Sequence, residues 1–148
     1  MYIVAFMYPS AGDQAFNYDH FVNVHLPMGV GLTEKYLNIK PEKIVVFTPI
    51  TGGDGELASS PYCAISSCYF NSEEHAKTFA TLFTFEEAAR RLSADFANYT
   101  LSAPDVIISK VHELSNMDAM ISSFQASEAA EVLLSAGKSG HHAGGELR

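Results

Sequence analysis

His25 is the side chain of this sequence best placed to carry out proton chemistry. It ends a stretch whose apolar residues recur at helical spacing, and Pro27 follows two positions later. Proline cannot continue a helix and disfavours helical geometry in the residue before it, so we expect a helix over about 13–26 that breaks at His25. An imidazole at such a break would lie at a pocket mouth, beside Tyr18 and Phe21, where it can change charge near neutral pH.

Two roles for His25 follow from residue chemistry. A neutral imidazole that is partly desolvated beside aromatic rings could act as a general acid or base. A histidine at a helix end can equally bond a backbone carbonyl or interact favourably with the helix dipole. Residue chemistry alone favours the second, structural role.

Asp95, Asn98 and Tyr99 form a second candidate cluster near the end of the next helical region. Asp95 could orient an imidazole or accept a hydrogen bond from Tyr99. In the structural alternative, which is equally open, Asp95 is solvated and Tyr99 packs. For Asn98 and Thr100 we expect structural roles, with Asn98 in the left-handed position that ends a helix.

Metal and nucleotide motifs are missing from the sequence. His20 lies five residues before His25, about 140° around an α-helix, so we expect the two imidazoles on different faces. No histidine and cysteine pattern has the spacing of a zinc site, and the H-E-x-x-H, dinucleotide and P-loop motifs are absent. The sequence therefore predicts a site without a metal or nucleotide.

Two segments resemble the ethyl tert-butyl ether degradation (EthD) family. The first segment shares four residues with the family pattern F-D-x-D-Y-Y-x-x-x-H-x-P, namely Phe16, Asp19, His25 and Pro27. His20 and Phe21 stand where the family usually has tyrosines. The second segment, residues 94–100, reads A-D-F-A-N-Y-T and is similar to the family's A-D-x-x-N-Y-T. The resemblance covers residues 1–112 and leaves 113–148 outside.

This resemblance implies a dimeric α+β barrel that binds a small hydrophobic organic molecule and is linked to the oxidative degradation of small organics. The candidate residues are catalytic His25, Tyr99 and Asp95, and pocket residues Tyr18, Phe21 and His20. The chemistry implied at His25 is acid/base or of the oxidoreductase type. Related barrels use a histidine for heme, so heme is the alternative to a cofactor-free site.

The pattern of elements predicts an α+β fold, the ferredoxin-like β-α-β-β-α-β arrangement with an antiparallel four-stranded sheet. The expected strands are residues 2–8, 43–48, 62–70 and 105–112. A second helical region should start at residues 71–74 and break near Thr84. The extension over 113–148 should be helical to about residue 136 and then end in a loosely held tail.

Both faces of the expected strands are apolar, unlike those of a sheet with one solvated face. In the first strand, one face carries Ile3, Ala5 and Met7, and the other carries Tyr2, Val4, Phe6 and Tyr8. Both helices of this topology normally cover the same face, so the second face needs another cover. We favour a second copy packed sheet to sheet, and the alternative is the extension of the same chain.

Composition narrows the partners and the compartment. A formal net charge of −8 argues against nucleic acid and anionic membranes as partners. No apolar run reaches the length of about 20 residues that spans a bilayer, and residues 1–9 do not read as a signal peptide. Cys63 and Cys68 should lie on one strand about 16 Å apart, too far for a disulfide. Two free thiols are typical of a reducing cytoplasm.

Three functions follow from these features. The first is a cofactor-independent enzyme of the isomerase, cyclase or oxidoreductase type. The second is a non-catalytic module that binds or shuttles a hydrophobic intermediate for a partner enzyme. The third is an assembly unit whose interior is filled by its own side chains, which a structure without a pocket near His25 would favour.

Overall fold

The computed structural model describes residues 1–10, 16–56 and 59–146, and the side chains up to residue 137. The chain divides into two units, Met1–Val111 and His112–Arg148. The predicted start of the first helix near Asp13 lies outside the described residues.

The first unit is built on one antiparallel sheet with the strand order β2-β3-β1-β4. The strands are β1 (Tyr2–Pro9), β2 (Lys43–Phe47), β3 (Tyr62–Phe70) and β4 (Asp105–Lys110). In the register of the sheet, Val4 of β1 lies between Cys68 of β3 and Ile108 of β4. This order confirms the predicted ferredoxin-like α+β fold, and the strand bounds agree with the predicted ones to within two residues at each end.

The first helical region is continuous, and the predicted break at Pro27 is wrong. It consists of α1 (Tyr18–His20), the π-helical turn η1 (Phe21–His25) and α2 (Leu26–Leu37). Proline lacks an N–H and its ring crowds the preceding turn of an α-helix. Here the preceding turn is widened by i→i+5 bonding, in which the N–H of Leu26 donates to the carbonyl of Phe21, and Pro27 fits into the first turn of α2.

The second helical region breaks near Thr84 as predicted. Its parts are α3 (Glu73–Phe79), the 3-10 turn η3 (Leu82–Thr84), α4 (Glu86–Asp95) and the 3-10 turn η4 (Phe96–Asn98). The hydroxyl of Ser72 caps α3 by accepting a hydrogen bond from the backbone N–H of His75 at 3.0 Å. The chain therefore reaches β4 through two short helices rather than one long one.

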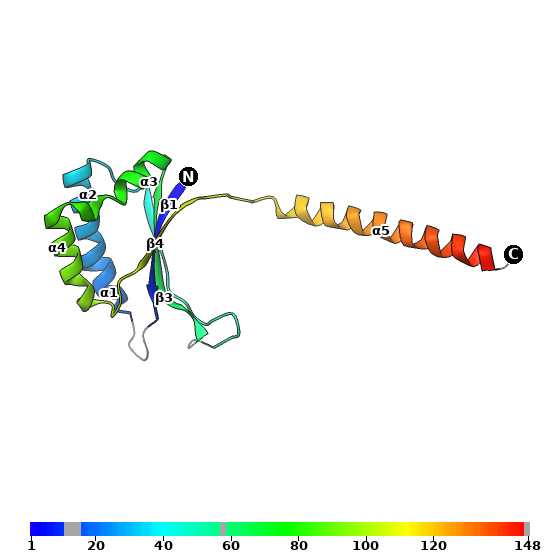
Figure 1. Ribbon diagram of the computed structural model, residues 1–148, viewed down its shortest axis with the longest axis horizontal. Coiled ribbons are helices and arrows are strands. Elements are labelled where there is room, and N and C mark those ends of the chain that lie inside the picture. Colours follow the sequence, from blue (N-terminus) through cyan, green and yellow to red (C-terminus); the bar gives the residue numbers. More distant parts are fainter. Residues whose placement is uncertain (11–15, 57–58, 147–148) are drawn as a thin grey trace. The chain divides into compact units, whose positions relative to one another are not determined.

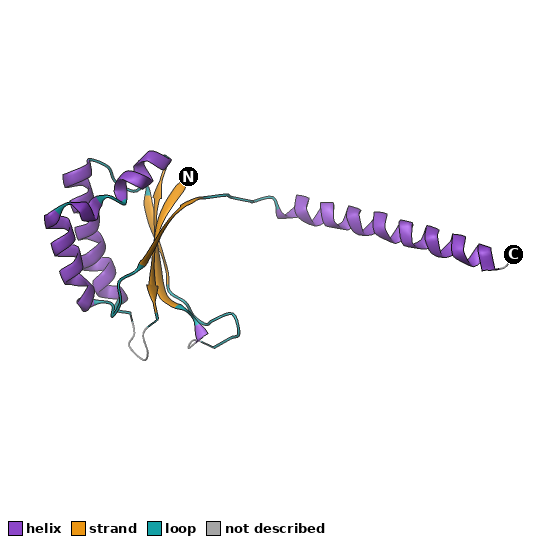
Figure 2. Ribbon diagram, viewed as in Figure 1, coloured by secondary structure: helices purple, strands orange, loops and turns teal. Residues whose placement is uncertain are grey.

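All helices of the first unit pack on one face of the sheet (Figures 1 and 2). That face carries Val4 and Tyr8 of β1, which are buried. Most of the buried apolar residues that the structure describes fall into three clusters, around Val4, Cys68, Phe70 and Phe79, around Tyr8, Phe21, Ala64 and Tyr99, and around Leu32, Leu82, Ala88 and Leu92. The first two clusters join the sheet to the helices, and the third joins α2 to η3 and α4.

The opposite face of the sheet is apolar too, as the strand pattern predicts. In register it presents Ala5 of β1 next to Ser67 of β3 and Ile107 of β4. Ile107 is 45% exposed, and Phe47 of β2 is also exposed. Within the described residues of the first unit, no helix covers this face (Figure 1).

The second unit contains one long helix, α5 (Met117–Glu146), which begins where the side chain of Asn116 accepts a hydrogen bond from the N–H of Ala119 at 3.0 Å. The helix extends past the predicted end near residue 136. Its large apolar side chains, among them Ile121, Phe124 and Leu133, are exposed. Among the described residues, no helix combines the length and apolar character needed to cross a membrane.

Candidate functional site

The carboxylate of Asp95, at the end of α4, is the centre of a buried polar cluster. Its Oδ1 accepts hydrogen bonds from His20 Nε2 at 2.8 Å and Asn98 Nδ2 at 2.9 Å, and its Oδ2 accepts one from His25 Nδ1 at 3.0 Å. Desolvation opposes ionisation, but the bonds from Asn98, His20 and His25 outweigh it and hold the pKa of Asp95 below its usual value. Asp95 is therefore an ionised acceptor at neutral pH, and both imidazoles donate to it.

His20 and His25 lie on the same side of their helix, contrary to the prediction. The expected angle of about 140° assumes an ordinary α-helix. The residues between them form the π-helical turn η1, in which five residues make up about one turn. This turn brings both imidazoles within hydrogen-bonding distance of one carboxylate.

A chain of hydrogen bonds leads from Asp95 through His25 to two tyrosines. His25 Nε2 lies 3.1 Å from the hydroxyl of Tyr99, which lies 3.1 Å from the hydroxyl of Tyr8. Burial holds the pKa of His25 below its usual value despite the opposing effect of Asp95, so the ring is neutral at pH 7. Because Nδ1 carries the proton given to Asp95, Nε2 accepts from Tyr99, and Tyr99 in turn accepts from Tyr8.

The two tyrosines stay protonated over a wide pH range. Burial raises the pKa of Tyr8 to about 12 and raises the pKa of Tyr99 above its ordinary value. The hydroxyls can therefore pass a proton along the chain without either one holding a negative charge. In this arrangement His25 is the proton acceptor, and Asp95 stabilises the imidazolium that would form.

The first helix is held against this cluster by backbone contacts. The N–H of Asn17 donates to the carbonyl of Tyr99 at 3.0 Å, and the side chain of Asn17 caps α1 by accepting from the N–H of His20 at 3.1 Å.

The left-handed position predicted for Asn98 is wrong, since Asn98 lies in η4. Its side chain instead donates to Asp95.

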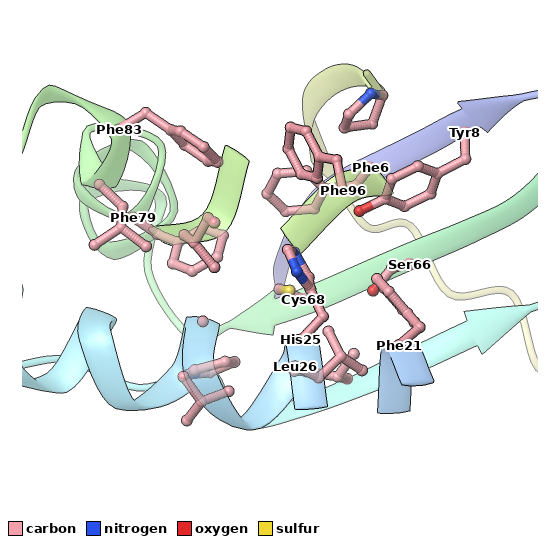
Figure 3. A pocket seen from close by; sticks show the side chains of 17 residues that line it. Phe6, Tyr8, Phe21, His25, Leu26, Ser66, Cys68, Phe79, Phe83 and Phe96 are labelled. Atoms are coloured by element: carbon pink, nitrogen blue, oxygen red, sulfur yellow. The ribbon is translucent and has the colours of Figure 1, made fainter. Parts of the chain in front are cut away.

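A cavity adjoins His25 on the helix-covered side of the sheet (Figure 3). Its walls are mostly apolar, both aromatic and aliphatic, including Phe6, Phe21, Leu26, Ile44, Phe79 and Phe96, and its polar side chains are Tyr8, His25, Ser66 and Cys68. The cavity volume is about 60 Å³. Phe83 also lines the cavity and is 41% exposed, so Phe83 lies at the rim.

The predicted pocket residues differ in their placement. Phe21 lines the cavity and stacks on the imidazole of His25, with ring centroids 5.6 Å apart. Tyr18 is 48% exposed and is not among the lining residues. His20 is held by Asp95, away from the lining. Asp95 and Tyr99 are not among the lining residues, and both are hydrogen-bonded to His25, which is.

Sequence reasoning missed Tyr8 and Ser66 as site residues. The alternation of β1 places Tyr8 on the same face as Val4 and Phe6, so the face could be inferred. Its contact with Tyr99, which is 91 residues away in sequence, could not. Ser66 carried no local signal, because a serine in an apolar strand is unremarkable until its surroundings are known.

Heme does not fit this site. Both ring nitrogens of His25 are engaged, one with Asp95 and the other with Tyr99, so an iron ligand would have to displace one of these bonds. Across residues 1–10, 16–56 and 59–146, no group of three or more His, Cys, Asp or Glu side chains is placed to hold a metal ion.

The fold and the site define a ferredoxin-like α+β protein with an acid–imidazole–phenol chain at an apolar cavity. No protein-family model matches the sequence, and no match was found among curated proteins.

Two of the solved structures similar to this chain are described as EthD proteins. An EthD-like protein from Ralstonia eutropha JMP134 is 23% identical, with a TM-score of 0.60 over 78% of this chain and 96% of that one. An ethyl tert-butyl ether degradation (EthD) family protein from Bacillus halodurans C-125 is 17% identical, with a TM-score of 0.50 over 76% of this chain and 99% of that one. The shared fold is the one that the sequence motifs imply.

Proposed function

We propose that this chain is an EthD family protein that binds a small hydrophobic organic molecule in the cavity beside His25 and performs acid/base chemistry on it. The observation that carries the proposal is the chain of hydrogen bonds from Asp95 through His25 and Tyr99 to Tyr8, which ends at the cavity wall. A buried polar chain in contact with an otherwise apolar cavity is the usual form of a small-molecule site.

The proton would move along bonds that already exist. A ligand in the cavity gives a proton to the oxygen of Tyr8, Tyr8 gives its own proton to Tyr99, and Tyr99 gives its proton to His25 Nε2. The ligand is left as the conjugate base, and the positive imidazolium is paired with Asp95. Reversal of these steps returns a proton to the product, as isomerisation or cyclisation requires.

The alternative is a non-catalytic module that binds or shuttles a hydrophobic intermediate for a partner enzyme. The apolar lining supports it, since such a cavity retains a ligand whether or not a reaction follows. In either case the EthD resemblance associates the protein with the oxidative degradation of small organics, and the free thiols of Cys63 and Cys68 suit a cytoplasmic location.

Native mass spectrometry of the protein purified without added ligand tests the binding, because it shows any small molecule that the protein retains. That molecule, once identified, is the substrate for a turnover assay at several pH values. Turnover with a bell-shaped pH profile that is lost in His25→Gln but kept in His75→Gln supports the enzyme; His75 is an exposed histidine on α3. Retention without turnover, unchanged in His25→Gln, would select the binding module.

We further propose that the open face of the sheet packs against the same face of a second copy, giving the dimeric barrel. Exposed apolar side chains such as Phe47 and Ile107 support this, since a face of this kind is unfavourable in water. Ile107 and Ile108 make a matched pair, 45% and 43% exposed on opposite faces of β4. Ile107→Glu should halve the mass measured by light scattering and Ile108→Glu should not; the reverse result would exclude this interface.

The apolar residues of α5 suggest that the extension packs on the barrel rim or on a partner. Deletion of residues 116–148 tests this. A lower oligomer mass or thermal midpoint supports packing within the assembly, and unchanged values for both would contradict it.

A further inference from the structure

Ser66 has a buried hydroxyl without a hydrogen-bond partner. Its side chain is 1% exposed, and its Oγ is the one buried side-chain N or O atom left unpaired among the described residues. Buried hydroxyls in proteins are nearly always bonded, because leaving one unpaired is costly. An exception beside a cavity points to a group that the cavity is built to receive.

The position of Ser66 on β3 explains why the protein itself does not satisfy it. In register it lies between Phe6 of β1 and Val46 of β2, and both neighbours are apolar. Ser66 lines the cavity together with Cys68, two residues farther along the same face (Figure 3). The thiol of Cys68 is at most a weak hydrogen-bonding group. The cavity floor therefore offers one strong polar contact.

Tyr8 offers the cavity a second polar contact of a different kind. Its proton is given to Tyr99, so its remaining capacity is that of an acceptor. Tyr8 lies opposite Ala64, and Ser66 is the diagonal neighbour on the same face of the sheet. Ser66 can thus donate to a ligand atom, and Tyr8 can accept from one. A ligand hydroxyl can do both at once, whereas a ketone or an ether can satisfy Ser66 alone.

The charge of the lining limits the ligand further. Apart from the neutral His25, none of the described side chains that line the cavity is acidic or basic. An ionised ligand would lose its hydration without gaining a counter-ion, which is strongly unfavourable. The aromatic walls favour a flat or compact apolar body.

We propose that Ser66 recognises the ligand of this cavity, and that the ligand is a small uncharged alcohol or phenol whose oxygen accepts from Ser66 and whose proton faces Tyr8. This inference rests on the proposed function, since it names the kind of molecule bound at the same site. It also supplies the group from which the hydrogen-bonded chain would withdraw a proton.

Phenol, anisole and toluene form a matched set of probes. Phenol has both a donor and an acceptor, anisole has an acceptor only, and toluene has neither. Their dissociation constants are measured by NMR titration of the full-length chain, as wild type, Ser66→Ala and Ser67→Ala. Ser67 is the control because it is buried in the same strand but points to the opposite face.

The expected result is a preference for phenol over toluene that falls about tenfold in Ser66→Ala, the equivalent of one hydrogen bond, and is unchanged in Ser67→Ala. Anisole should bind more weakly than phenol to the wild type. Without ligand, Ser66→Ala should unfold at the same or a higher temperature, because it removes an unpaired buried hydroxyl.

Two other results would overturn the inference in different ways. If phenol and toluene both bind but Ser66→Ala leaves their ratio unchanged, or if anisole binds as tightly as phenol, the role given to Ser66 or to the ligand hydroxyl is wrong and the apolar site stands. If no probe binds the wild type, the proposed binding function fails as well.

Discussion

The helix α4 carries two carboxylates that are bonded in the same manner but in different surroundings. Glu87, near its start, accepts from Tyr36 and Lys35 of α2 and from Arg91 one turn later. Asp95, at its end, accepts from two histidines of the first helical region and from Asn98 of η4. Each carboxylate therefore accepts from three side chains, two of which tie α4 to the first helical region.

The difference between the two clusters is burial. The side chain of Glu87 is 31% exposed and two of its partners are lysine and arginine, whereas that of Asp95 is 10% exposed and its partners are two imidazoles and an amide. Hydrogen bonds from Tyr36 and Lys35 lower the pKa of Glu87 to about 2, yet water competes for every group there. At Asp95 burial leaves much less water to replace a lost bond, so the same number of contacts should matter far more.

The largest effect should come from removing the buried charge. Asp95→Asn should lower the free energy of unfolding by about 3 kcal/mol, because it leaves buried donors facing an amide. Glu87→Gln should lower it much less. Urea denaturation of both variants checks this. Equal losses would show that burial does not distinguish the two clusters.

The tyrosines give the next comparison. Tyr99→Phe should cost about 2 kcal/mol, since it removes the partner of both His25 Nε2 and the hydroxyl of Tyr8. Tyr36→Phe removes one bond at a solvated carboxylate and should be milder. The same denaturation assay applies, and a greater loss in Tyr36→Phe would contradict the comparison.

The pH dependence of stability should be governed by the buried cluster. The pKa of His25 is lowered in the folded state, so the unfolded chain binds a proton first and stability should fall as the pH drops below about 6.5. The raised pKa values of Tyr8 and Tyr99 act in the opposite direction, so stability should also fall above about pH 10. The slope between pH 7 and 5.5 should flatten in His25→Gln and persist in His75→Gln.

Salt should produce the smallest effect, and it should act on the other cluster. Raising the ionic strength screens exposed ion pairs and leaves buried ones largely untouched. The difference in urea midpoint between wild type and Glu87→Gln should therefore shrink in 1 M sodium chloride. The difference for Asp95→Asn should stay constant, and a comparable decrease there would show that solvent reaches Asp95.

Local patterns predicted much of the fold and part of the site. The four strands and the break near Thr84 follow from alternation, helical spacing and capping residues, all of which act over a few neighbours. His25, Asp95 and Tyr99 were named together because two short motifs resembled one family. A bond from Asp95 to an imidazole was one of the alternatives that the sequence left open, whereas the bond between Tyr99 and His25 was not predicted, because it joins residues 74 apart in sequence.

The wrong predictions for the first helical region arose from the π-helical turn Phe21–His25, which no residue pattern in the sequence indicates. The phase of the first helix was calculated for an ordinary α-helix, and Pro27 was taken as its end. One extra residue in the turn Phe21–His25 places His20 and His25 on the same side of the helix and lets the helix continue through Pro27. Ser66 was missed for a different reason, since an unpaired hydroxyl is defined only by what its neighbours in space lack.

That widened turn sets the rotational alignment of everything before it. Deleting one residue between Phe21 and His25 would restore regular winding and turn His20 by about 100° around the axis, away from Asp95. The helix would still form and His25 would keep its place, but Asp95 would lose its hydrogen bond from His20. Deleting one residue from this turn is thus enough to break the contact of His20 with Asp95, although neither side chain is changed.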